Sequence, residues 1–145
     1  MKTVGQIVNA KSSTNVHTIA PTDSVLTALQ VMAEKNIGAL PVAEADGHLI
    51  GIISERDYAR KGVLLGHSSF ATPVSAIMSA NLVTVTPEHK LEECMQLMTD
   101  RHLRHLPVLE DGKLVGMLSI GDVVKETIAE KESLIQHLEQ YIRGE

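Results

Sequence analysis

The chain has 145 residues, with 13 basic and 18 acidic side chains and a formal net charge of −5 when histidine is neutral. A chain of this length buries roughly 70% of its unfolded surface on folding, so it can form a hydrophobic core without disulfides or a metal. The negative charge and an aromatic content of 2% argue against nucleic acid as a partner, because such proteins need basic surfaces and stacking platforms.

The apolar stretches are short, such as residues 49–53, whereas a membrane-spanning helix needs roughly 20 residues. The first residues, Met1 to Gln6, lack the apolar core of a secretory signal. A single cysteine, Cys94, cannot form an internal disulfide. We therefore expect a cytoplasmic protein that makes no contact with a membrane.

The chain contains an internal repeat. Residues 18–42 match residues 84–108 at an offset of 66, with seven of 25 positions identical, and residues 46–57 match 111–122 at an offset of 65, with six of 12 identical. Two copies of one structural unit are therefore predicted.

Each copy begins with a short extended segment that ends in Thr-x-x-Pro, followed by an apolar stripe at helical spacing. The stripe residues are Val25, Ala28, Leu29 and Met32 in the first copy, and Leu91, Cys94, Met95 and Met98 in the second. This spacing predicts one amphipathic helix per copy. The stripe methionines and Cys94 are interpreted as residues of the hydrophobic core.

A hairpin is predicted next in each copy. Leu-Pro-Val at 40–42 or 106–108 precedes an Asp-Gly turn, and a second apolar run follows at 49–53 or 114–118. Each copy then closes with Ser-x-x-Asp, Ser54 to Asp57 or Ser119 to Asp122, leading into another helix. The unit is thus strand, helix, strand, strand, helix, in the α/β (α+β) class.

These features resemble the cystathionine-β-synthase (CBS) domain pair, also called a Bateman module. The resemblance rests on the doubled unit, the Leu-Pro-Val runs, and the segments Gly51 to Asp57 and Gly116 to Asp122, and it covers residues 3–127. The segments Val4-x-x-Ile7-Val8 and Val74-x-x-Ile77-Met78 look like the lead-in helix of the family.

The resemblance implies two tandem CBS units (β-α-β-β-α) packed about a pseudo-twofold axis. We expect a first unit with its lead-in helix at 1–70, a second unit at 71–127 and a C-terminal helical tail at 128–145. The family context implies a regulatory sensor in signal transduction, with no effector domain, no catalytic activity and no required cofactor.

Ser-x-x-Asp at a strand-to-helix boundary can hold a nucleotide. A helix N-terminus attracts phosphate, the serine hydroxyl adds a donor, and the carboxylate of Asp57 or Asp122 can accept both hydrogens of a ribose diol. The resemblance implies the same assignment, because family members commonly bind AMP, ADP or ATP, and sometimes other adenosyl ligands, with this Asp on ribose and the Leu-Pro-Val backbone beside adenine. The sequence does not separate these ligands from a dinucleotide such as NAD(H).

The predicted nucleotide-binding residues lie in both copies. They are Thr18, Ala39, Leu40, Pro41, Ser54, Arg56, Asp57, Thr84, Arg104, His105, Leu106, Pro107, Ser119, Gly121 and Asp122. The two sites should differ, because Arg56 is followed by Arg60 and Lys61 in the first copy, whereas the second copy has Arg104 and His105 before its Leu-Pro-Val run. In a pseudo-twofold arrangement, Arg56 or Arg104 could serve a phosphate held by the opposite copy.

Two alternatives remain open for the motif and its surroundings. Ser-x-x-Asp is also close to a capping box, so both motifs could serve only to cap helices in a structural or interaction protein. The charged residues Arg56, Arg104, Arg60 and Lys61 could then form an ordinary solvated surface. An enzyme acting on nucleotides is the third possibility, but the sequence offers no catalytic constellation.

A metal site and a reactive thiol are not favoured. His89, His102 and His105 lack the cysteine pair or carboxylate that would complete a zinc site. Cys94 has no neighbouring histidine or basic residue and lies on an apolar stripe, so we expect a buried, unreactive thiol.

The last segment has an apolar stripe of its own. Val124, Ile128, Ile135, Leu138 and Ile142 follow one another at spacings of 4, 7, 3 and 4 in a helix over 123–143. The stripe either packs back on its own chain or forms a dimer contact. The family habit of pairing modules favours a homodimer formed by the CBS pairs and this helix, read by an unknown effector protein.

Overall fold

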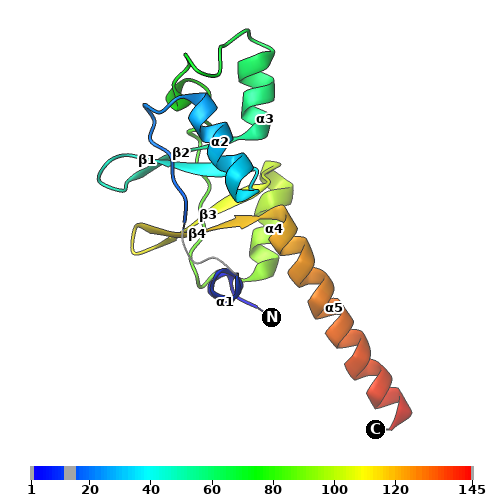
Figure 1. Cartoon of the computed structure of the whole chain (residues 1–145). Helices are drawn as coiled ribbons and strands as arrows, with labels where there is room; N and C mark the ends of the chain where they lie inside the picture. Colours follow the sequence, from blue (N-terminus) through cyan, green and yellow to red (C-terminus); the bar gives the residue numbers. More distant parts are fainter. Residues whose placement is uncertain (1, 12–15, 145) are drawn as a thin grey trace. The chain divides into compact units, whose positions relative to one another are not determined.

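The computed structural model describes residues 2–11 and 16–144 of the chain (Figure 1). Contacts divide the chain into two compact units. The first-repeat unit comprises residues 15–83 and 111–114, and the second-repeat unit comprises residues 1–14, 84–110 and 115–145. Residues 1, 12–15 and 145 of the expected domains lie outside the described residues, and the limits 1–70, 71–127 and 128–145 stay a prediction for the family units.

The first-repeat unit carries the elements predicted for one copy. They are α2 (Val25–Lys35), β1 (Ala39–Ala43), β2 (Leu49–Ser54), α3 (Glu55–Asp57), the π-helix η1 (Tyr58–Val63) and the 3-10 helix η2 (Val74–Ala76). Their apolar faces meet in one core, which includes Ile19, Met32, Leu40, Ile53 and Ile77.

Helix α2 has the position and the buried face that the apolar spacing predicts. The Ser24 hydroxyl caps it by accepting from the backbone N–H of Thr27, and it ends at Asn36, whose φ of 55° is left-handed. Val25, Ala28 and Met32 are buried and Leu29 is half-buried. Stripe spacing and both caps thus agree on the same helix.

Strands β1 and β2 form the predicted antiparallel hairpin, with Ala39 opposite Ser54 and Leu40 opposite Ile53. The extended segment expected before α2 is shorter than predicted. It is reduced to a parallel bridge between Ile19 and Val42. A turn follows at once, because the N–H of Asp23 donates to the Ala20 carbonyl and the Asp23 carboxylate accepts from the Ala20 N–H, and this turn ends the pairing.

The second-repeat unit holds α1 (Val4–Ala10), α4 (Leu91–Arg101), β3 (His105–Glu110), α5 (Ile120–Arg143) and, from Val115 on, β4 (Lys113–Ser119). The turn between β3 and β4 is Asp111-Gly112, with φ of 51° and 78°. Positive φ at both central residues is the geometry of a tight type I′ hairpin, which explains why glycine follows aspartate there. A parallel bridge between Val85 and Val108 replaces the expected first strand.

The two lead-in segments each pack on a glycine of a hairpin strand. Helix α1 packs within the second-repeat unit, where a Cβ on Gly116 would lie 2.8 Å from a methyl of Val8. The segment after η2 packs within the first-repeat unit, where a Cβ on Gly51 would lie 2.6 Å from the sulfur of Met78. Glycine is therefore required in both strands to let the lead-in approach.

This packing differs from the expected placement of the first lead-in helix with the first copy. The N–H groups of Val4 and Gly5 donate to the carbonyls of His89 and Pro87 at 2.8 and 2.9 Å, so α1 is tied to the second repeat. The second lead-in segment is also shorter than expected, since only Val74–Ala76 is helical. Val74 and Ile77 are nevertheless buried, as are Val4 and Ile7.

The closing helices of the two copies differ in length and type. The first is a single α-turn that passes into η1, whereas the second, α5, runs for 24 residues. In the described part of the chain, no helix combines the length and the hydropathy that a bilayer crossing requires.

Candidate functional site

The candidate site of the first repeat lies where β2 ends and α3 begins. The N–H and the hydroxyl of Ser54 both lie 3.0 Å from Oδ2 of Asp57, and the Asp57 N–H donates to the Ser54 hydroxyl at 3.1 Å. This is a complete capping box. Asp57 keeps 19% of its side chain exposed, and Lys61 Nζ lies 3.9 Å from its Oδ1.

The second repeat repeats this geometry where β4 ends and α5 begins. The Ser119 N–H donates to Oδ2 of Asp122 at 2.9 Å, and the Asp122 N–H donates to the Ser119 hydroxyl at 3.1 Å. A further donor reaches the same oxygen, because Lys11 Nζ lies 2.8 Å from Oδ2. The capping interpretation of both motifs is confirmed as local geometry.

The first N–H of each closing helix is bonded to the residue before the preceding hairpin. Glu55 N–H donates to the Gly38 carbonyl at 3.1 Å, and Ile120 N–H donates to the Arg104 carbonyl at 2.8 Å. Each junction is therefore fixed from two sides, by the box and by this bond. The serine and aspartate side chains consequently hold the same positions in both repeats.

Asp122 is held as a carboxylate. Burial opposes its ionisation, but the hydrogen bonds from Lys11 and from the Ser119 N–H, together with the positive charge of Lys11, outweigh burial and lower its pKa. An ionised carboxylate accepts hydrogen bonds and donates none. This is the state that binding to a ribose diol requires.

His105, at the start of β3, is held as a neutral imidazole. Burial lowers its pKa; the Asp122 carboxylate opposes this effect, and the charges of Lys11 and Arg104 add to it. His105 is thus electrostatically coupled to Asp122, whereas sequence reasoning singled it out by comparison of the two copies, as a residue before the second Leu-Pro-Val run.

Acidification should therefore destabilise the second-repeat unit through His105. In the unfolded chain His105 takes up a proton near its ordinary pKa of about 6.5, whereas in the folded protein it does so only at a lower pH. The stability that the neutral imidazole contributes above pH 6.5 is therefore lost as the pH falls from there toward the folded pKa. Urea unfolding at pH 7 and pH 5 should show a smaller loss in His105→Gln than in the wild type, by at most about 1.4 kcal/mol per pH unit. His137→Gln, on the exposed part of α5, is the matched control; equal losses in all three proteins would contradict the assignment.

The structure places the other predicted residues around these junctions or near them. Leu40 and Leu106 are fully buried in β1 and β3, and Ala39, Pro41 and Pro107 are buried beside them. The Pro41 carbonyl accepts from the Ile19 N–H at 3.1 Å, and the Pro107 carbonyl accepts from the Val85 N–H at 3.0 Å. Thr18, Arg56, Arg104 and Gly121 are exposed, and Thr84 is half-buried. Each repeat therefore brings its Ser-Asp pair to the end of the strand that is paired with its Leu-Pro-Val strand.

Lys11 is the residue of this site that sequence reasoning missed. It follows α1 as its C-cap and donates to the Met117 carbonyl at 2.9 Å as well as to Asp122. The two partners of this ion pair are 111 residues apart. No local pattern joins them, and only the packing of α1 on the second repeat could have revealed the pair.

The remaining chemical candidates have structural roles. Cys94 is buried, as expected, and burial, with the neighbouring Glu93 carboxylate, raises the pKa of its thiol to about 11. His89 Nδ1 accepts from the Thr86 N–H at 3.0 Å, and His102 is the left-handed C-cap of α4.

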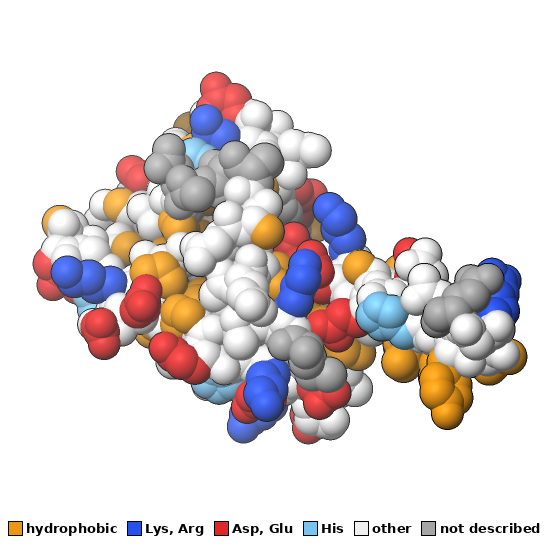
Figure 2. Space-filling view, turned by 90° about the horizontal axis from the view of Figure 1, so that it is seen from below, with side chains coloured by type: hydrophobic (Ala, Val, Ile, Leu, Met, Phe, Trp, Pro, Cys, Tyr) orange, Lys and Arg blue, Asp and Glu red, His pale blue; other side chains and the backbone are white. Residues whose placement is uncertain are grey.

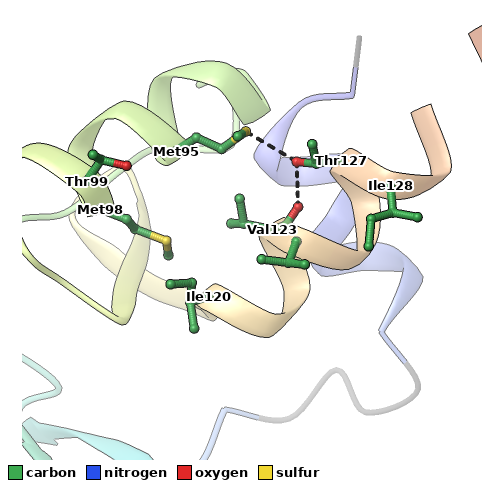
Figure 3. A pocket seen from close by; sticks show the side chains of 8 residues that line it. Met95, Met98, Thr99, Ile120, Val123, Thr127 and Ile128 are labelled. Carbon is green, nitrogen blue, oxygen red and sulfur yellow. Dashed lines mark hydrogen bonds between the residues drawn. The ribbon is translucent and has the colours of Figure 1, made fainter. Parts of the chain in front are cut away.

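An apolar groove lies between α4 and α5, as Figure 3 shows. It has a volume of about 200 Å³ and is lined by Met95, Met98, Thr99, Ile120, Val123, Val124, Thr127 and Ile128. The Thr127 hydroxyl donates to the Val123 carbonyl at 2.8 Å and lies 3.2 Å from the Met95 sulfur. The expectation that Met95 belongs to the core is wrong, since it is 38% exposed at this groove, whereas Met32 and Met98 are buried.

The exposed apolar face continues along α5 past the groove. Every residue of α5 from 131 to 143 is exposed, including Leu134, Ile135, Leu138, Tyr141 and Ile142. Hydrophobic side chains gather along one side of the protruding end of this helix in Figure 2. Among the described residues of this unit, Ile135, Leu138 and Ile142 therefore do not pack back on the chain, whereas Val124 and Ile128 line the groove with α4.

A comparison with known protein families matches both copies of the repeat. A model of the CBS domain matches residues 4–63 and 74–128. CBSX3, a mitochondrial CBS domain-containing protein of Arabidopsis thaliana, is 46% identical over 126 residues, which are 84% of this chain and 61% of that protein. YhcV of Bacillus subtilis (strain 168) is 37% identical over 111 residues, or 77% of this chain and 78% of that protein.

Solved structures agree. A CBS-domain protein from Burkholderia ambifaria MC40-6 has a TM-score of 0.84 and 51% identity, covering 88% of this chain and 95% of that one. CBSX2, solved in complex with AMP, has a TM-score of 0.72 and 29% identity, covering 90% and 99%. With two tandem family matches and antiparallel strand pairs in both repeats, the chain belongs to the CBS domain family.

Proposed function

We propose that this protein is a regulatory sensor that binds an adenine nucleotide at the Ser-Asp junctions of its CBS units and has no catalytic activity. The observation that carries the proposal is the duplicated carboxylate: Asp57 and Asp122 occupy the same place after the hairpin, each partly exposed and each fixed by a serine. The AMP complex of CBSX2 supports the same ligand class.

The proposed contacts follow from the chemistry of the ligand. The carboxylate of Asp57 or Asp122 accepts from the 2′- and 3′-hydroxyls of ribose, and charge-assisted bonds of this kind contribute about 1.5–3 kcal/mol each. The backbone of β1 or β3 lies beside adenine, with the other residues predicted above around it. Arg56 and Arg104 supply positive charge for phosphate.

Homodimerisation through the CBS pairs and α5 is the second part of the proposal. Exposed apolar side chains of α5 lie at the groove that it forms with α4 and again from Leu134 to Ile142. An amphipathic helix gains stability by burying such a face against a partner. An effector protein would then recognise the change in the shape of the dimer on nucleotide binding. This is a role in signal transduction, the process for which the Burkholderia protein is named. The cytoplasmic location stays a prediction.

Isothermal titration of nucleotide-free protein with AMP, ADP, ATP, NAD and NADH tests the sensor. Saturable binding that depends on Asp57 or Asp122 supports it, and the order of the five affinities identifies the ligand. Flat traces with all five, from protein shown to be folded, would favour the other candidate: an interaction protein in which the observed capping boxes are the whole role of the motifs.

A further inference from the structure

The ammonium of Lys11 is hydrogen-bonded to the Asp122 carboxylate, the group that the proposed function assigns to ribose in the second repeat. Its Nζ lies 2.8 Å from Oδ2 of Asp122 and 2.9 Å from the Met117 carbonyl oxygen. The Lys11 side chain is 37% exposed and the Asp122 side chain is 23% exposed. The ammonium is therefore held at two points, one of them the last strand before the junction.

This ion pair fills the hydrogen-bonding capacity of one carboxylate oxygen. A carboxylate oxygen has about two lone-pair sites, and Oδ2 of Asp122 already accepts from the Ser119 N–H at 2.9 Å and from Lys11. A ribose diol that binds both oxygens of Asp122 must displace the ammonium from Oδ2. The cost of this displacement falls on any ligand that binds there.

Asp57 faces a much weaker competitor. The ion pair that the described residues give Asp57 is with Lys61, whose Nζ lies 3.9 Å from Oδ1, beyond hydrogen-bonding distance. Its Oδ2 accepts from the N–H and the hydroxyl of Ser54, and a hydroxyl can rotate away to release a lone pair. The two repeats thus present the same carboxylate with different internal occupants.

We propose that Lys11 is a specificity-determining residue that competes with ribose for Asp122 and so makes the second site selective for phosphorylated ligands. The inference rests on the proposed function. A nucleotide brings its own negative charge, which offers the displaced ammonium a new partner, whereas adenosine offers none. The second site should therefore favour AMP over adenosine more strongly than the first site does.

The test compares adenosine with AMP in a protein in which Asp57→Ala weakens the first site. In that background, Lys11→Met should tighten adenosine binding and leave AMP binding unchanged. The dissociation constant of adenosine divided by that of AMP should therefore fall about five- to tenfold. Lys11→Arg keeps the charge and should keep the ratio. The matched control is Lys61→Met in an Asp122→Ala background, where the ratio at the first site should stay unchanged.

The outcomes separate this inference from the proposed function. One outcome overturns the role of Lys11 and leaves the proposed function intact. In it, AMP binds measurably, the Lys11→Met variant unfolds cooperatively, and the ratio of the dissociation constants of adenosine and AMP does not change. Weaker adenosine binding in Lys11→Met also overturns it, because Lys11 would then be a ligand contact. Absence of binding in the wild type, in both backgrounds and with both ligands overturns the nucleotide site and this inference together.

Discussion

Asp57→Ala is expected to weaken nucleotide binding at the first site by at least about ten- to hundredfold, the equivalent of one of its two charge-assisted hydrogen bonds to ribose. The carboxylate is the group of the first junction that can accept from both ribose hydroxyls, and alanine removes both acceptor oxygens. Titration with the preferred nucleotide measures the loss, and Asp122→Ala gives the corresponding value for the second site.

The same substitution removes a helix cap, so binding must be separated from stability. Loss of a cap typically costs about 1 kcal/mol of stability. Asp23→Ala is the matched control, because the Asp23 carboxylate also accepts from a backbone N–H in the first-repeat unit, that of Ala20 at 3.1 Å, and has no place in the proposed site. It should lower the unfolding temperature to a similar extent and leave the titration unchanged.

Two results would decide against the ribose assignment. Titration curves that stay the same in both Asp57→Ala and Asp122→Ala would show that neither carboxylate contacts the ligand. An equal loss of binding in Asp23→Ala would show that cap stability, and not the ribose contact, causes the effect.

The local elements were predictable because each depends on residues close together in the sequence. The stripes of α2 and α4, the Asp111-Gly112 turn and the Ser-x-x-Asp caps follow from spacings of one to four residues, and the structure contains them all. The repeat added confidence in the pairing of β1 with β2 and of β3 with β4. The family identity followed from the same motifs.

The contacts that distinguish the two sites were not predictable in this way. The packing of α1 on Gly116 and the ion pair of Lys11 with Asp122 join segments more than a hundred residues apart. The turn after Ile19, which shortens the expected strand, depends on a side chain bonding back to the backbone. Met95 follows the helical spacing of the core stripe, yet it lies at the edge of that face and opens onto the groove.

The apolar face of α5 should make the protein dimeric, and charge placed on that face should make it monomeric. Ile135 and Leu138 lie one helical turn apart and are 53% and 52% exposed. A single apolar side chain of this size contributes about 1.5–3 kcal/mol when it is fully buried. The double variant Ile135→Glu with Leu138→Glu should therefore raise the dimer dissociation constant by two orders of magnitude or more, at roughly 1.4 kcal/mol for each factor of ten.

Sedimentation equilibrium over a range of concentrations measures this change directly. Gln136→Glu with Gln140→Glu is the matched control, since it adds the same charge to exposed positions of α5 that the apolar stripe leaves out. This control should remain dimeric, because its charges face solvent and leave the stripe intact. A wild type that is monomeric at every concentration, or a charged stripe that leaves the dimer unchanged, would contradict a role for this part of α5 in dimerisation.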